Sequence, residues 1–106
     1  TGVHQFVRIG AHSMTGVGTV LLQDLPPYVT AAGDTAKPHG INSEGLKRRG
    51  FSAEAIMAIK RAYKMLYRNG LTLDEACKAV AEMAASHPEV KLLVDFLAAP
   101  GRGIVR

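Results

Sequence analysis

The stretch "VHQFVRIGAHSMTGVGTVLLQDL", Val3 to Leu25, follows neither the period of a half-buried strand nor that of an amphipathic helix. Its residues instead repeat every six positions, in two columns. The first column is aliphatic apart from one threonine, and the second is mostly small or β-branched. The columns are Val3, Ile9, Thr15 and Leu21, and Val7, Ser13, Thr19 and Leu25. Short repeats of this kind are typical of parallel β-helices, in which each repeat stacks on its neighbours.

A six-residue unit would form one flat side of a triangular coil. We therefore expect Val3, Ile9 and Leu21 to point into a shared apolar interior, with short parallel strands and no hairpin. Glycines that follow two first-column residues, Gly10 and Gly16, would relieve the backbone at the corners. Because four repeats are few, the periodicity alone also allows a glycine-rich loop that precedes a helical domain.

The repeats end in a segment with three prolines and two glycines, "DLPPYVTAAGDTAKPHG", Asp24 to Gly40. This segment crosses into a region with a different pattern. We assign residues 1–31 to the terminal coils of a hexapeptide-repeat parallel β-helix and residues 32–106 to a C-terminal α-helical domain.

Helix signals fill the second region. A short helix is expected after the N-cap residue Asn42, with Gly50 as its stop. Ser52 caps a longer amphipathic helix, Thr72 and Glu75 are spaced as the capping box of the next, and a third follows. Together they predict a small helical bundle. We expect it to bury Ile56, Ile59, Leu66, Val80, Leu93 and Phe96.

The composition narrows the class of protein and of partner. The chain has 106 residues, a formal net charge of +4 and no apolar run long enough to span a membrane. Its single cysteine, Cys77, cannot form an internal disulfide, which fits a cytoplasmic protein. The basic charge fits an anionic small molecule or an acidic protein as partner. Neither zinc-finger spacing nor an aromatic-rich basic patch supports binding to nucleic acid.

Five blocks of the sequence resemble the C-terminal part of the UDP-N-acetylglucosamine O-acyltransferases: "TGVHQF", "IGAHSM", "DLPPYVTAAGD", "GINSEGLKRRGF" and "RGIVR". The most specific features are "HQF" and the later "NSEGLKRRGF". The resemblance implies the last coils of a left-handed parallel β-helix followed by a small C-terminal helical bundle. It also implies a homotrimer with active sites between the subunits.

The resemblance further implies a reaction. Enzymes of this family move an (R)-3-hydroxyacyl chain from the acidic acyl carrier protein to the 3-hydroxyl of UDP-N-acetylglucosamine, in the first step of lipid A synthesis. They use a histidine general base and no metal or redox cofactor. That histidine, its carboxylate partner and the oxyanion N–H belong to earlier coils. We therefore expect this chain to be a fragment without catalytic residues, inactive alone.

What remains is the binding end of the site. The resemblance assigns substrate binding to His4, Gln5, Asn42, Glu44, Arg48 and Arg49. Each residue type also has a local explanation. Asn42 is a plausible helix cap, Glu44 and Arg48 are spaced for an intrahelical ion pair, and Arg49 could be a solvated charge. His4 could be a structural histidine and Gln5 a solvated side chain.

The remaining histidines are expected to have no role, with His12 exposed on a coil side and His39 and His87 in loops. Two other functions stay open at this point. One is the N-acyltransferase that acts later in the same pathway, which shares the β-helix and the donor. The other is a non-catalytic module for trimerisation or for carrier-protein binding.

Overall fold

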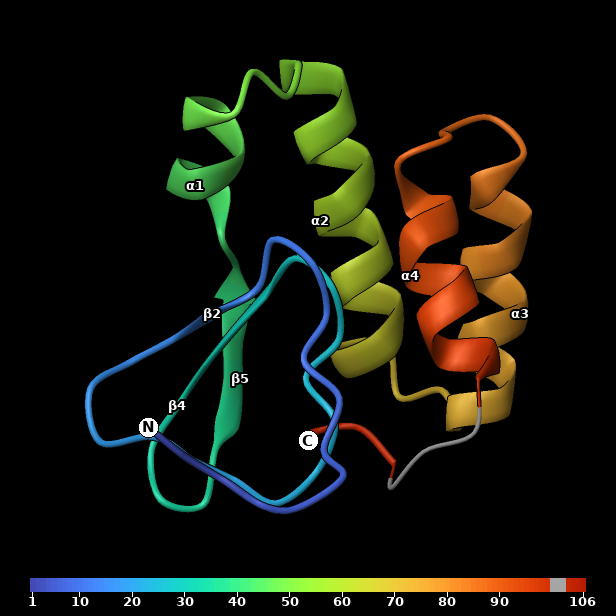
Figure 1. The fold of residues 1–106 in the computed structure, drawn as a ribbon. Helices are drawn as coiled ribbons and strands as arrows, with labels where there is room; N and C mark the ends of the chain where they lie inside the picture. Colours follow the sequence, from blue (N-terminus) through green and yellow to red (C-terminus); the bar gives the residue numbers. More distant parts are fainter. Residues whose placement is uncertain (100–102) are drawn as a thin grey trace.

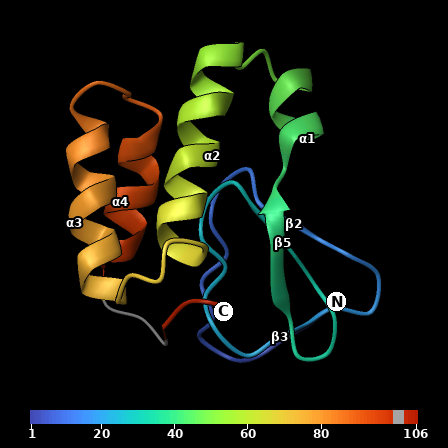
Figure 2. The same cartoon turned by 180° about the vertical axis from the view of Figure 1, so that it is seen from behind.

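The computed structural model describes residues 1–99 and 103–106, and it places a small coil of strands beside a set of helices (Figure 1; Figure 2). The strands are short, and the helices follow them along the chain. In order, the elements are β1 (Gly2–Val3), β2 (Met14–Thr15), β3 (Val20–Leu21), β4 (Val29–Ala32), β5 (Lys37–Ile41), α1 (Ser43–Arg48), α2 (Ala53–Tyr67), α3 (Leu73–Ala84) and α4 (Val90–Ala98).

Parallel pairing confirms the predicted coil, but the six-residue period holds on only one of its sides, because the partners on the other two sides are 16 rather than 18 positions apart. β1 pairs with β3 so that Val3 lies opposite Leu21, three repeat units further on. β2 pairs in the same sense with β4, and an isolated parallel bridge between Ile9 and Leu25 supplies the third side. The chain therefore makes one triangular turn and lays a second turn against it, as the overlapping traces in Figure 1 show.

The coil interior is less complete than the two columns predicted. Leu21 is fully buried, but Val3 and Ile9 are 47% and 54% exposed, so the expectation that all three are buried is wrong. Within this chain, Val3 and Ile9 lie on the first turn, which is covered by a second turn on one side only. The apolar cluster is instead built by the second turn, with Leu25, Val29 and Ala31, and is closed by Tyr63 of α2.

A hairpin after the coil was not predicted. β4 pairs antiparallel with β5, with Val29 opposite Ile41 and Ala32 opposite Lys37. β5 lies beyond residue 31, in the segment that we had given to the helical domain. Its sequence, "KPHGI", contains a proline and a glycine, which together resemble a turn. Pro38 is compatible with a strand here because β5 is at the edge of its sheet, where proline is tolerated.

The helix boundaries follow the predicted caps. The Asn42 side chain accepts from the N–H of Gly45, and the Ser52 hydroxyl accepts from the N–H of Ala55. The capping box at the start of α3 is present in both directions, between Thr72 and Glu75. Four local sequence signals therefore define where three of the helices begin.

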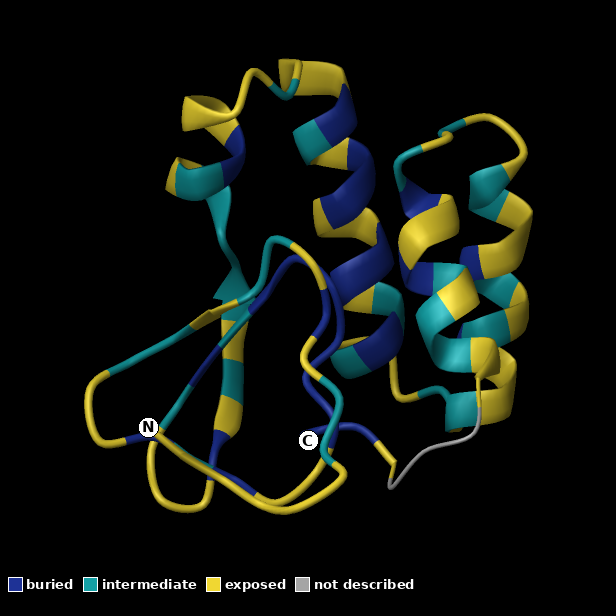
Figure 3. Cartoon of the chain, in the orientation of Figure 1, coloured by how far each residue is buried: buried dark blue, intermediate teal, exposed yellow. Residues whose placement is uncertain are grey.

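Helices α2, α3 and α4 pack around the larger apolar cluster (Figure 3). Of the six residues expected there, Ile59, Leu66, Val80 and Leu93 are buried. The other two, Ile56 and Phe96, are only half-buried at the edge of the cluster, so their expected full burial is wrong. Phe96 also lies against the Arg8 guanidinium of the coil, and Ile56 packs against the cluster only from outside.

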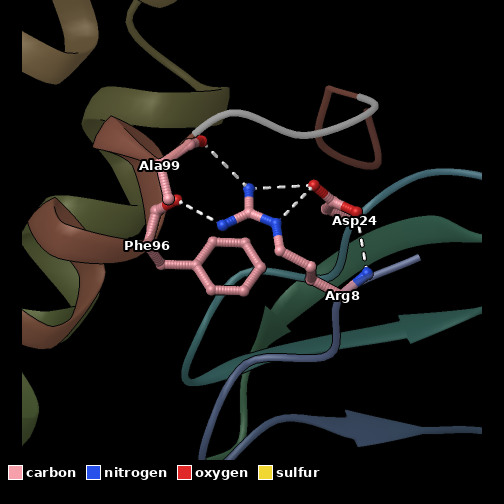
Figure 4. A network of polar contacts seen from close by, with 4 residues as sticks. All are labelled: Arg8, Asp24, Phe96 and Ala99. Carbon is pink, nitrogen blue, oxygen red and sulfur yellow. Dashed lines mark hydrogen bonds and ion pairs between the residues drawn. The ribbon is translucent and has the colours of Figure 1, made fainter. Parts of the chain in front are cut away.

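An ion pair joins the coil to the helices (Figure 4). Asp24 is fully buried, and its carboxylate accepts from the backbone N–H of Arg8 at 2.8 Å and from the Arg8 Nε at 3.0 Å. The same guanidinium donates to the carbonyls of Phe96 and Ala99 at the end of α4. It also lies 4.2 Å from the centre of the Phe96 ring. One arginine therefore connects a coil corner to a helix C-terminus.

The C-terminal tail returns to the same place. The N–H of Asp24 donates to the carbonyl of Gly103, and the N–H of Val105 donates to the carbonyl of Asp24. Ile104 and Val105 are both buried. The tail therefore adds a short parallel bridge to the coil beside the ion pair.

The packing predicts a large effect at Leu66, which is 2% exposed in the cluster between the helices. We expect Leu66→Ala to lower the free energy of unfolding by about 2–5 kcal/mol, because truncation leaves a cavity that the neighbours only partly fill. Urea titration measures this. Met57→Ala, on the exposed side of the same helix, is the control and should cost less than about 0.5 kcal/mol. Equal losses at both positions would contradict this packing.

The ion pair predicts an unequal response at its two ends. Arg8→Met leaves a fully buried carboxylate without its cation, so we expect a loss of about 3–5 kcal/mol in the free energy of unfolding. Asp24→Asn leaves a guanidinium that is 31% exposed and still bonded to two carbonyls, so its cost should be smaller. Thermal or urea unfolding compares the two variants. If Asp24→Asn lowered the free energy of unfolding more than Arg8→Met, the unpaired buried carboxylate would not be the main cost of breaking the pair.

Candidate functional site

The short helix α1 is held against one corner of the coil. The N–H of Asn42 donates to the carbonyl of Tyr28 at 2.8 Å, and its side-chain Nδ2 donates to the carbonyl of His12 at 3.3 Å. The other end of that side chain caps the helix at Gly45. A Cβ atom on Gly45 would collide with the Asn42 carboxamide, so a larger residue there would displace the side chain that caps the helix. The helix cap and the anchor to the coil are the same residue.

The corner below α1 is aromatic. The His12 ring stacks on the Tyr28 ring with centroids 5.8 Å apart and planes within 3°, and Phe51 meets His12 edge-on at 5.1 Å. We call His12, Tyr28 and Phe51 the aromatic corner. Tyr28 is fixed in turn, because its hydroxyl donates to the carbonyl of Glu89 at 2.7 Å. Burial, and then the nearby charge of Glu89, raise the pKa of Tyr28, which keeps this hydroxyl a donor.

The two arginines at the end of α1, Arg48 in its last turn and Arg49 at its C-cap, are placed differently. Arg49 turns toward the aromatic corner, where its Nη1 lies 2.6 Å from the His12 Nδ1. Arg48 is exposed and makes no ion pair within the described part of the chain. Glu44 pairs loosely with Lys47 at 4.0 Å, so the ion pair between Glu44 and Arg48 that their spacing allows is not formed. α1 therefore presents exposed positive charge beside one fixed guanidinium.

The structure does not bring the six expected site residues together within one chain. His4 and Gln5 are exposed at the turn that follows β1, and the His4 Nδ1 lies 2.9 Å from the Gln5 carbonyl. α1 is tied to the next corner of the triangle, at His12 and Tyr28. The residues form two groups: the first two at one corner, and Asn42, Glu44, Arg48 and Arg49 at another.

A second basic surface lies along α2. A cavity of about 410 Å³ opens between this helix and the end of β5. Lys60, Lys64 and Arg68 line it, and their spacing of four places them on one face of the helix. A neighbouring cavity of about 340 Å³ adds Lys37 and Arg106. We call the five cations of these two cavities the α2 basic face.

A buried phenol lies under this face. The Tyr67 hydroxyl has no hydrogen-bond partner among the residues that the structure describes. Burial raises its pKa strongly, the neighbouring Tyr63 adds to this, and Arg106 lowers it in part. Tyr67 is therefore a neutral phenol, packed at a tilt against the Tyr63 ring, rather than an acid or base.

Two parts of this site were missed from the sequence. His12 was expected to be exposed and without a role, yet it is half-buried and contacts Arg49. Nothing in its sequence neighbourhood signals this, because its partners are 16, 37 and 39 positions away. The α2 basic face was detectable, since three of its cations recur every four residues along α2 and its C-cap. They lie apart from the apolar stripe of the helix, however, and such a pattern is also typical of an ordinary solvated helix face.

Comparison with known proteins decides the family. A family model described as UDP N-acetylglucosamine O-acyltransferase, domain 2, matches residues 24–105. The chain belongs to the UDP-N-acetylglucosamine O-acyltransferase family. It is 61% identical over 106 residues to an acyl-[acyl-carrier-protein]–UDP-N-acetylglucosamine O-acyltransferase of Thiobacillus denitrificans, and 57% identical over 110 residues to that of Burkholderia lata.

Solved structures of the family share the fold. The UDP-N-acetylglucosamine acyltransferase of Francisella novicida superposes with a TM-score of 0.95 at 42% identity, over 99% of this chain. The protein from Acinetobacter baumannii gives 0.94 at the same identity and coverage. Membership of this family separates the chain from the N-acyltransferase that the sequence analysis left open.

The chain spans only part of its O-acyltransferase relatives. It covers 41% of the Thiobacillus protein and 42% of the Burkholderia protein, and 39% of the Francisella structure. Among the residues that the structure describes, no helix is both long enough and apolar enough to cross a membrane.

Proposed function

We propose that the protein to which this chain belongs transfers an (R)-3-hydroxyacyl group from acyl carrier protein to the 3-hydroxyl of UDP-N-acetylglucosamine, in lipid A biosynthesis in the cytoplasm. The names of its relatives support the donor and acceptor classes. The observation that carries the proposal to this chain is the pair Arg48 and Arg49 on a helix anchored to the coil corner. This is the nucleotide-binding end of the site.

The arginines suit a pyrophosphate. A guanidinium fork matches phosphate oxygens in pairs, where a lysine offers a point charge. Neighbouring residues on a helix point about 100° apart, so Arg48 and Arg49 cannot easily hold one phosphate together. We propose that Arg49, which faces the aromatic corner, binds one phosphate within the groove of its own subunit, and that Arg48 binds the second phosphate, in the same groove or in that of a neighbouring subunit. Asn42 and Glu44 complete this group.

We propose that His4 and Gln5 act together with α1 of a second subunit. They lie at a different corner of the coil from α1 of their own chain. A trimer with grooves between subunits would bring the turn of one chain to α1 of the next. Exposed apolar side chains on the coil fit such an assembly, since large unpaired apolar surface marks contact sites. They include Val3, Phe6, Ile9, Met14 and Val17.

We propose that the reacting groups come from outside these 106 residues. An alcohol near neutral pH is a poor nucleophile toward a thioester, so the reaction needs a general base and a donor for the developing oxyanion. A histidine of an earlier coil would be that base, and no metal or redox cofactor would take part. This chain would bind and orient the substrate, and it would not turn over alone.

The α2 basic face suits the donor. Acyl carrier protein is acidic, and a cluster of cations steers an acidic partner toward a binding surface. Lys60, Lys64 and Arg68 lie on the helix next to α1, so a protein held there would be close to the nucleotide end. The alternative of a non-catalytic carrier-binding or trimerisation module keeps this face but has no need of the α1 arginines.

The arginines provide the test of the proposed function. In the full-length protein, Arg48→Ala and Arg49→Ala should each weaken binding of the UDP-sugar by about 1.5–3 kcal/mol. This loss should appear as a higher KM for the UDP-sugar, with kcat nearly unchanged. The reason is that both phosphates stay bound throughout acyl transfer. Steady-state assays with acyl carrier protein as donor measure this, and Arg48→Lys should recover only part of the affinity. KM within twofold of the unchanged protein for both alanine variants would place the pyrophosphate elsewhere.

Charge reversal tests the donor surface separately. Lys64→Glu in the full-length protein should raise KM for the acyl carrier protein about 3–10-fold, and this effect should shrink as salt is added. KM for the UDP-sugar should not change. Lys78→Glu on α3 is the matched control, because Lys78 is also exposed but lies outside the α2 basic face. Equal effects of the two reversals would mean that the donor responds only to net charge.

A further inference from the structure

His12 contacts two of the proposed ligand residues. The Nη1 of Arg49 lies 2.6 Å from its Nδ1, and the side chain of Asn42 donates to its carbonyl at 3.3 Å. A guanidinium can only donate, so the Nδ1 atom must accept this bond and a neutral ring carries its proton on Nε2. The contact therefore has a defined direction, from the arginine to the histidine.

The His12 ring is itself held on both sides. Tyr28 stacks flat against it and Phe51 meets it edge-on, and the Tyr28 hydroxyl is bonded to the start of α4 at Glu89. The backbone of His12 has a φ of +60°, a left-handed conformation that histidine adopts more readily than most residues. The acceptor atom is thus fixed by the coil corner and by two aromatic rings before any ligand binds.

We propose that His12 is a positioning residue that orients the guanidinium of Arg49 for the nucleotide phosphate. Arg49 is an exposed side chain near the end of a short helix, and without a partner it would sample many rotamers. Holding it in one arrangement removes part of the ordering cost of binding. This inference rests on the proposed role of Arg49 as a phosphate ligand. It assigns to His12 a role through Arg49 and no contact with the reacting atoms.

A purely structural role for His12 makes a different prediction. If the ring only packs the corner, its replacement should affect stability, and any loss of affinity should be the same with or without Arg49. If it positions Arg49, the loss of affinity should disappear once Arg49 is removed. The coupling between the two residues therefore separates the explanations.

Two substitutions separate the aromatic ring of His12 from its hydrogen-bond acceptor. His12→Phe keeps an aromatic ring for Tyr28 and Phe51 and removes the acceptor, and the chain already holds aromatic residues with positive φ at Phe6 and Tyr28. His12→Asn keeps an acceptor close to the Nδ1 position and tolerates positive φ, but it loses the ring.

The experiment uses the full-length protein and UDP as the probe, with calorimetry for Kd and steady-state assays for KM and kcat. We expect His12→Phe to raise Kd for UDP and KM for the UDP-sugar about 3–10-fold, the loss of one hydrogen bond, with kcat within twofold. His12→Asn should lie between His12→Phe and the unchanged protein. In the Arg49→Ala background, His12→Phe should cause no further loss.

Three results of the binding experiment would overturn the inference. His12→Phe could leave Kd unchanged while Arg49→Ala raises it, or it could cause the same loss in both backgrounds. Arg49→Ala could itself leave Kd unchanged, which would also remove the proposed role of Arg49. If the His12 variants do not fold, the contact can still be tested in a protein that keeps His12. The ¹⁵N resonance of the Nδ1 atom should shift on Arg49→Ala, and an unchanged resonance would exclude the contact.

Discussion

The buried carboxylate of Asp24 is the constraint on which the arrangement of the parts depends. It is fully buried, and it holds the Arg8 side chain through both of its oxygens. A carboxylate without a cation at such a place would be costly, so Arg8 must stay at the corner. The same guanidinium donates to carbonyls at the end of α4. If the coil moved away from the helices, either these hydrogen bonds or the ion pair with the Asp24 carboxylate would therefore be lost. The C-terminal tail is hydrogen-bonded to the Asp24 backbone, so its position also depends on this residue.

The corner next along the coil builds the proposed ligand surface in the same way. Tyr28 and His12 stack there, Asn42 bonds to both of their carbonyls, and α1 starts at Asn42. The position of the arginines is thus set by the coil rather than by α1 itself, which has only six residues. A helix of that length would not be stable alone, so its orientation depends on these anchors.

Local signals in the sequence were sufficient for several elements. The six-residue columns predicted parallel pairing, because that period has few other structural uses. Asn42, Ser52 and the pair Thr72 and Glu75 predicted helix starts, because each cap acts within four residues.

The features that depend on distant residues were not accessible in this way. The hairpin was hidden because its edge strand contains Pro38, which resembles a turn when the sheet around it is unknown. The exposure of Val3 and Ile9 depends on how many turns cover them, which the period does not state. The contact of His12 with Arg49 requires the coil corner to be folded first. The six proposed ligand residues stay predictions, since within this chain they lie in two groups at different corners of the coil.

The direction of β5 has a consequence for how the stack of coils ends. β1 to β4 all pair in parallel, so each turn offers a template on which an identical turn could grow. β5 pairs antiparallel and takes the free side of β4, and Pro38 lacks the N–H that a further strand would need. A repeat that could otherwise extend between molecules into fibrils is therefore terminated within its own chain.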